Sequence, residues 1–151
     1  MDAVTYPEQK VVDYIMDHLL PVRIPFNHER YSKEYSIEWT PTLIVLDSDG
    51  KEATRSTGFL SPDELIAFLH LAIGRANFAA GNFEPAIKAF DYVAEQFPKS
   101  AFAPEAIYYR GVARYKHTKD AKPLREVYDR LSVDYPEDQW TKKSYPYRLI
   151  A

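Results

Sequence analysis

Residues 35–58 constrain the fold of this chain more than any other stretch. Four apolar residues at positions 43–46 precede Asp47-Ser48-Asp49-Gly50, and a polar run over residues 51–57 follows. A short apolar run bounded by turn residues is typical of a buried strand. An Asp-Gly turn between two extended runs indicates a hairpin, because glycine accepts a positive φ. We therefore expect a strand, a tight turn and an edge strand.

The residues before this stretch predict a helix, a short strand and a second helix. Residues 8–20 carry apolar side chains at helical spacing, which predicts an amphipathic helix that ends at Pro21. The pattern of residues 22–26 alternates, and the prolines around them place the predicted strand at an edge or an end of a sheet. We expect Asn27 to cap a brief helix over residues 28–35.

The stretch from Tyr35 into the next helix resembles the second half of the thioredoxin fold. The matching residues, in order, are Tyr35, Ser36, Ile37, Thr40, Pro41, Thr42, residues 43–46, Gly50, Gly58, Leu65, Ile66 and Phe68. The resemblance implies a cis proline, an apolar strand, a glycine turn, a partner strand and a final helix. The Cys-x-x-Cys motif of that family is absent, because the chain contains no cysteine.

The resemblance also implies that one strand is missing from the sheet. The redox motif and the central strand, which in the family separates strands like residues 22–24 and 43–46, would fall upstream of Met1. A sheet without its middle strand leaves two rows of backbone groups without partners. Either the sheet pairs in another way, another chain fills the gap, or the sequence is an N-terminal truncation of a longer product.

The second half of the sequence predicts helical hairpins. Ser61-Pro62-Asp63-Glu64 combines an N-cap serine, a proline at the first helical position and a glutamate three residues after the cap, so a helix begins there. The following residues resemble a tetratricopeptide repeat, a two-helix hairpin of about 34 residues. The matching positions are Leu71, Gly74, Phe78, Gly81, Phe83, Ala86, Phe90 and Pro98, and those of a weaker second copy are Ala106, Gly111, Tyr115, Pro123, Tyr128 and Pro136.

Together these patterns predict an α/β part followed by an all-α part: an incomplete thioredoxin-like fold joined to a tetratricopeptide-like unit of two hairpins. We place the thioredoxin-like domain at residues 1–68 and the helical repeats at residues 69–151, with the first helix shared between them. The tail after Pro136 keeps several large apolar residues and is expected to cap the last hairpin, because terminal repeats need capping. The alternative is a strip that binds a partner.

Composition limits the possible functions. The chain has 151 residues, and no apolar run is long enough to span a bilayer, so we expect a cytoplasmic protein that binds no membrane. Its net charge of −3 does not favour nucleic acid as a partner. Without cysteine the chain cannot perform thiol-disulfide exchange, although the family implied is one of oxidoreductases. The four histidines are scattered and no phosphate-binding glycine loop is present, so no metal and no cofactor are expected.

Two groups of residues are candidate binding sites. The resemblance implies that Thr40 and Pro41 pair with an extended peptide beside Trp39; the alternative is that Pro41 only shapes the sheet and Trp39 fills the core. A basic stretch with interleaved tyrosines could bind an acidic partner through Arg110, Arg114 and Lys122, or it is the solvated face of a repeat helix.

Two functions are compatible with these observations. In the first, the chain is a redox-inactive module that binds peptides or partner proteins. A second copy of the chain is one such partner, in a homodimer that completes the sheet. In the second, it is the C-terminal part of a thiol-disulfide oxidoreductase whose Cys-x-x-Cys lies upstream of Met1. We favour the first for the chain as it stands, because the nucleophile of the second is not in the sequence.

Overall fold

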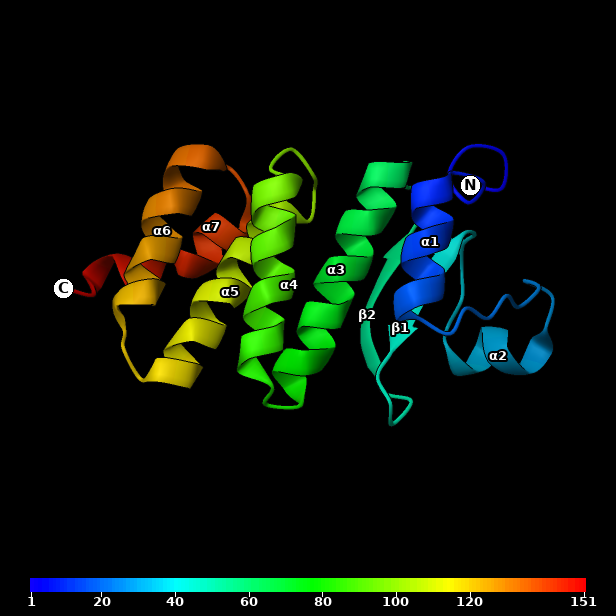
Figure 1. Cartoon of the computed structure of the whole chain (residues 1–151), viewed down its shortest axis with the longest axis horizontal. Coiled ribbons are helices and arrows are strands. Elements are labelled where there is room, and N and C mark those ends of the chain that lie inside the picture. The colour runs from blue at the N-terminus through cyan, green and yellow to red at the C-terminus, as the bar shows by residue number, and fades with distance from the viewer. The chain divides into compact units, whose positions relative to one another are not determined.

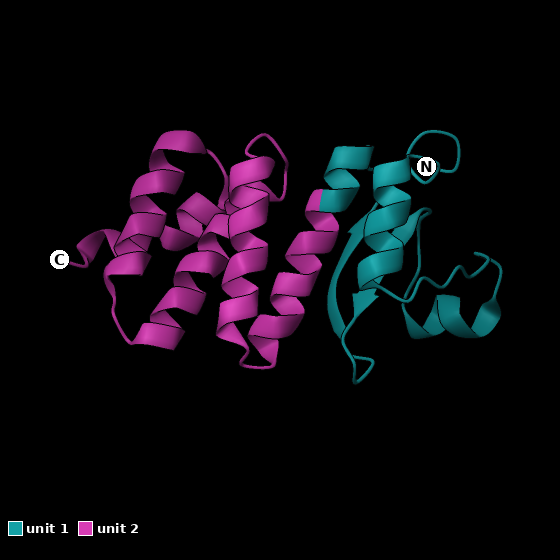
Figure 2. Cartoon of the chain, in the orientation of Figure 1, with its two compact units in different colours: residues 1–66 teal, residues 67–151 magenta.

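The computed structural model describes all 151 residues, and its helices and strands follow one another along the chain as Figure 1 shows. They are α1 (Gln9–His18), α2 (Glu29–Glu34), β1 (Thr42–Leu46), β2 (Glu52–Thr57), α3 (Pro62–Ala79), α4 (Phe83–Gln96), α5 (Ala103–Thr118), α6 (Lys122–Asp134), α7 (Gln139–Ser144) and the 3-10 helix η1 (Tyr145–Leu149). The chain divides into two units, Met1–Ile66 and Ala67–Ala151 (Figure 2). The predicted fold class, an α/β part followed by an all-α part, is confirmed.

The sheet of the first unit is a hairpin of two antiparallel strands, β1 and β2. Thr42 lies opposite Thr57 and Val45 opposite Thr54, with an irregularity in the register between Val45 and Leu46. Gly50 in the connecting turn has φ of 77°, a conformation in which a residue with a β-carbon would be strained. The strands and the turn predicted for residues 43–57 are therefore confirmed.

The N-terminal elements correct two predictions. The predicted helix over residues 8–20 is present as α1, but the predicted strand over residues 22–26 is wrong, since this segment forms no strand. The sheet has only two strands, so no neighbour supplies the backbone groups that a strand needs. The brief helix α2 is capped by His28, whose ring accepts a hydrogen bond from the amide of Tyr31 at 3.4 Å, and not by Asn27.

Helix α3 begins where its capping residues predict. The Ser61 hydroxyl accepts a hydrogen bond from the amide of Glu64 at 3.3 Å, as an N-cap serine does. The helix then continues without interruption to Ala79, so its first residues belong to the first unit and the others to the second.

Two helical hairpins, α3 with α4 and α5 with α6, build the second unit, and each has a glycine where the facing helix leaves no space for a β-carbon. A β-carbon on Gly74 would lie 2.6 Å from the ring of Phe90, and one on Gly111 would lie 2.0 Å from a methyl group of Val127. Phe90 and Val127 are both buried. The tetratricopeptide-like spacing of small and large residues is thus reproduced in both hairpins.

The C-terminal segment packs on the second hairpin. The ring of Trp140 lies 5.0 Å from that of Tyr108, and the hydroxyl groups of Tyr108 and Tyr147 share a hydrogen bond of 2.9 Å. Burial and this hydrogen bond raise the pKa of Tyr147. Helix α7 and η1 therefore cover apolar surface that α5 and α6 would otherwise expose.

We predict that Gly111→Ala destabilises the second hairpin, because its new methyl group would overlap Val127. The expected loss is about 1–3 kcal/mol in the free energy of unfolding, measured with urea, although alanine favours a helix over glycine. The control is the same substitution in a Val127→Ala background, where the overlapping methyl group is gone and the loss should be smaller. An equal loss in both backgrounds would contradict the steric explanation.

Candidate functional site

The loop between α2 and β1 contains the predicted peptide-binding residues. The Thr42 hydroxyl donates a hydrogen bond of 2.6 Å to the carbonyl of Trp39, and the amide of Gly58 donates one of 2.8 Å to the carbonyl of Pro41. The peptide bond between Thr40 and Pro41 is cis. These contacts hold the loop to the first residue of β1 and to the end of β2.

The same loop leaves polar and apolar groups accessible. Thr40 is exposed, and its amide and carbonyl make no hydrogen bond within the chain. The side chain of Trp39 is 69% exposed, so it does not fill the core. A backbone amide and carbonyl on one accessible residue can pair with an extended peptide, and an adjacent indole can pack against one of its apolar side chains.

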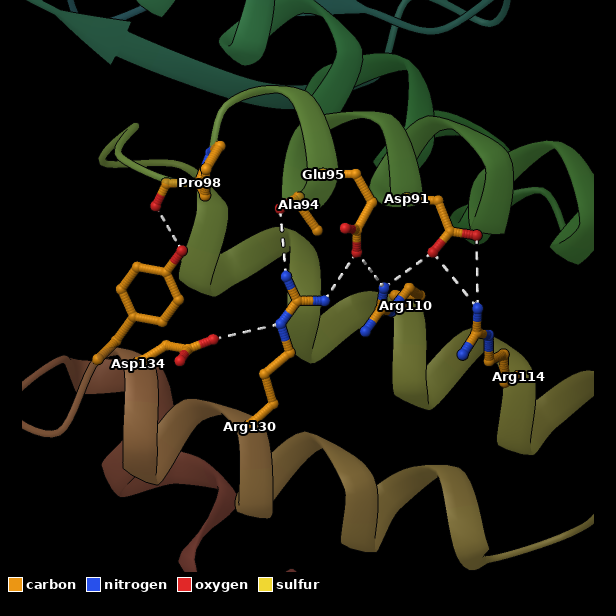
Figure 3. A network of polar contacts seen from close by, with 9 residues as sticks. Asp91, Ala94, Glu95, Pro98, Arg110, Arg114, Arg130 and Asp134 are labelled. Atoms are coloured by element: carbon orange, nitrogen blue, oxygen red, sulfur yellow. Dashed lines mark hydrogen bonds and ion pairs between the residues drawn. The ribbon is translucent and has the colours of Figure 1, made fainter.

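The second group of predicted residues lies in a network of ion pairs between α4 and α5 (Figure 3). Arg110 contacts Asp91 at 2.9 Å and Glu95 at 3.4 Å, and Arg114 contacts Asp91 at 3.3 Å. Both arginines therefore have acidic partners within the chain. Only 14% of the Arg110 side chain is exposed, which leaves little of its charge for an external partner.

Helix α6 joins the same network through Arg130. This side chain contacts Glu95 at 2.9 Å, donates to the carbonyl of Ala94 at 3.3 Å and lies 3.5 Å from Asp134 (Figure 3). The hydrogen bond from Arg130 lowers the pKa of Glu95, with a smaller contribution from Arg110. We call the charged residues of these contacts the ion-pair ladder: Asp91, Glu95, Arg110, Arg114, Arg130 and Asp134.

Lys122 lies apart from the ladder. It is the first residue of α6, its side chain is exposed, and its amide donates a hydrogen bond to Asp120 at 2.9 Å. The three predicted basic residues are thus not in one site: Arg110 and Arg114 share Asp91, while Lys122 stands at the turn between α5 and α6.

Sequence reasoning missed the acidic half of the ladder. Asp91 and Glu95 are four residues apart on α4, as Arg110 and Arg114 are on α5. Residues four apart lie on one face of a helix, so two such pairs of opposite charge on consecutive helices are the signal that could have indicated the contact.

No group of three or more His, Asp or Glu side chains lies close enough together to hold a metal ion. None of the helices combines the length and the apolar character needed to cross a bilayer.

We predict that Glu95→Gln changes how stability depends on pH. A carboxyl group whose pKa is lowered by folding stabilises the protein above its unfolded pKa, and this contribution is lost as the pH falls through the folded pKa. The variant should be less stable than the parent at pH 7, by at most about 1 kcal/mol because the pair is partly exposed, and the difference should vanish towards pH 3. Urea unfolding at several pH values measures this difference in the free energy of unfolding.

The matched control is Glu126→Gln on α6, because Glu126 is exposed and forms no ion pair. This substitution should leave the pH dependence of the parent nearly unchanged. A stability difference for Glu95→Gln that is the same at pH 7 and pH 3 would show that the ladder contributes no pH-dependent stability.

Comparison with known proteins agrees with the two units. Residues 3–73 match the model of the thioredoxin-like domain, and residues 69–100 match that of the tetratricopeptide repeat. No curated protein and no solved structure matched the chain. The second hairpin, α5 with α6, lies beyond the matched repeat but has the same close approach at its glycine. The chain therefore contains a thioredoxin-like domain over residues 3–73 and a tetratricopeptide repeat over residues 69–100, and it has no cysteine.

Proposed function

We propose that this chain is a peptide- or protein-binding module that works without thiol chemistry. The observation that carries the proposal is the loop at Thr40, where an accessible amide and carbonyl stand beside the exposed indole of Trp39. The tetratricopeptide repeat supports it, because such repeats generally mediate contacts between proteins. No residue of the chain as given supplies the thiol that disulfide exchange needs.

The proposed ligand at this loop is an extended peptide segment. Its backbone would exchange hydrogen bonds with Thr40, and an apolar side chain would cover Trp39. Backbone pairing gives little selectivity for sequence, so the requirement for an apolar residue at one position would come from Trp39.

Other partners and boundaries stay predictions. An acidic partner at Arg110, Arg114 and Lys122 would have to compete with Asp91 for both arginines, which leaves Lys122 as the accessible cation.

We keep residues 1–68 and 69–151 as the proposed functional domains and the cytoplasm as the proposed location. A second copy of the chain is also a proposed partner, because β1 pairs with β2 on one edge and with no strand on the other.

We predict that Trp39→Ala weakens peptide binding without loss of stability, because the side chain is mostly exposed. Immobilised extended peptides of varied composition would identify a ligand, and fluorescence anisotropy of that peptide would measure its dissociation constant. An aromatic anchor at the centre of a binding site contributes enough for the affinity to fall by about tenfold or more.

The matched control is Val133→Ala on α6, which removes another large exposed apolar side chain, 78% exposed, from the second unit. It should leave the affinity unchanged. Equal affinities for the parent and Trp39→Ala would exclude the loop as the site, and failure to bind any peptide would refute the proposed peptide binding.

A further inference from the structure

The pairing of β1 with β2 determines which backbone groups β1 leaves unused. The carbonyl of Pro41 accepts its hydrogen bond from Gly58, the residue directly opposite in the register, so the backbone of residue 41 faces β2. Successive residues of a strand direct their amide and carbonyl to alternate edges. Thr42 and Ile44 therefore direct theirs away from β2, to the outer edge of β1.

This outer edge pairs with no strand of the chain. Strand β1 contains neither a proline nor a charged residue that would discourage another strand. Thr42 and Ile44 are only partly buried, and Leu46 at the end of the strand is 39% exposed. The outer edge is thus a row of strand backbone groups with apolar neighbours and without partners.

Residues 20–26 of the same unit have the complementary character. The even-numbered residues are all apolar and all exposed: Leu20 by 96%, Val22 by 81%, Ile24 by 39% and Phe26 by 57%. The backbones of Val22 and Ile24 make no hydrogen bond within the chain. The segment that fails to form a strand therefore exposes the side chains that a strand would bury.

The prolines of this segment leave one of its two edges able to pair. Pro21 and Pro25 lack an amide hydrogen, and in a strand they would share an edge with Arg23. The amides and carbonyls of Val22 and Ile24 would point to the opposite edge, where no proline interferes. Added to a sheet by that edge, the segment would present its prolines outward and so prevent a further strand from adding.

We propose that residues 20–24 of one copy pair with the outer edge of β1 in a second copy, and that the second copy pairs reciprocally with the first. The inference rests on the second copy proposed as a partner above and names the surface it uses. Each chain carries both halves of the contact, and a reciprocal contact of this kind closes as a two-fold dimer.

The distribution of exposed apolar side chains favours this surface. Ten of the fifteen large apolar residues that are exposed lie in the first unit, although it is the shorter of the two. They are Val4, Val12, Met16, Leu20, Val22, Ile24, Phe26, Trp39, Leu46 and Phe59. Exposed apolar side chains that gather on one part of a protein are typical of an interface, and three of these residues, Leu20, Val22 and Ile24, belong to the proposed segment.

The test compares two proline substitutions in the complete chain by sedimentation equilibrium. Ile24→Pro removes an amide from the edge that pairs, whereas Arg23→Pro removes one from the edge that already carries two prolines. We expect the parent to be a dimer, Arg23→Pro to dimerise with nearly the same dissociation constant, and Ile24→Pro to dimerise at least about tenfold more weakly, since each dimer loses two hydrogen bonds.

Hydrogen exchange measured by NMR tests the pairing without a substitution. On dilution of the dimer to monomer, exchange of the amides of Val22, Ile24 and Ile44 should become faster. A dimer whose dissociation constant neither substitution changes, or whose exchange at these amides is the same as in the monomer, would refute this pairing but not the dimer. A parent that is monomeric at every concentration would refute both, and would leave peptide binding at Thr40 unaffected.

Discussion

The close approach of paired helices is the condition on which the second unit depends. At Gly74 and at Gly111 the neighbouring side chain occupies the space that a β-carbon would need. Two helices can therefore lie near enough for Phe90 and Val127 to enter the interior, where they join the clusters that also contain Ala106 and Leu131. The ion-pair ladder and the packed C-terminal segment then form on helices whose spacing is already determined by these contacts.

The first unit has the opposite character, because its backbone is less completely used. Its hairpin satisfies one edge of β1, and the loop at Thr40 has an unused amide and carbonyl. In the segment before α2, the backbones of Val22 and Ile24 make no hydrogen bond within the chain. Burying polar backbone groups without hydrogen bonds is costly, so these groups remain accessible to solvent or to another chain. Backbone groups of this kind are the ones with which an added peptide strand can pair.

Local signals in the sequence were sufficient where a structure is determined by neighbours along the chain. The turn ending at Gly50 predicted the hairpin, and the cap at Ser61 predicted the start of α3. The alternating pattern of residues 22–26 wrongly predicted a strand, because such a pattern shows which side chains would share a face and not whether a neighbouring strand is present. The contact of Asp91 with Arg110 was also missed, since a pairing between helices depends on how they pack. The binding role of Trp39 stays a prediction.

The ion-pair ladder also limits how the two helical hairpins could be extended into a longer repeat array. The equivalence of Gly74 with Gly111, and of Phe90 with Val127, places Tyr128 and Ser132 of α6 where α4 has Asp91 and Glu95. Tyr128 packs edge-on against Tyr145, and neither residue is acidic. Tandem duplication of the second hairpin would bring a new pair of arginines against a tyrosine and a serine. Lengthening the array by gene duplication would therefore require new charges at the junction as well as displacement of the C-terminal helices.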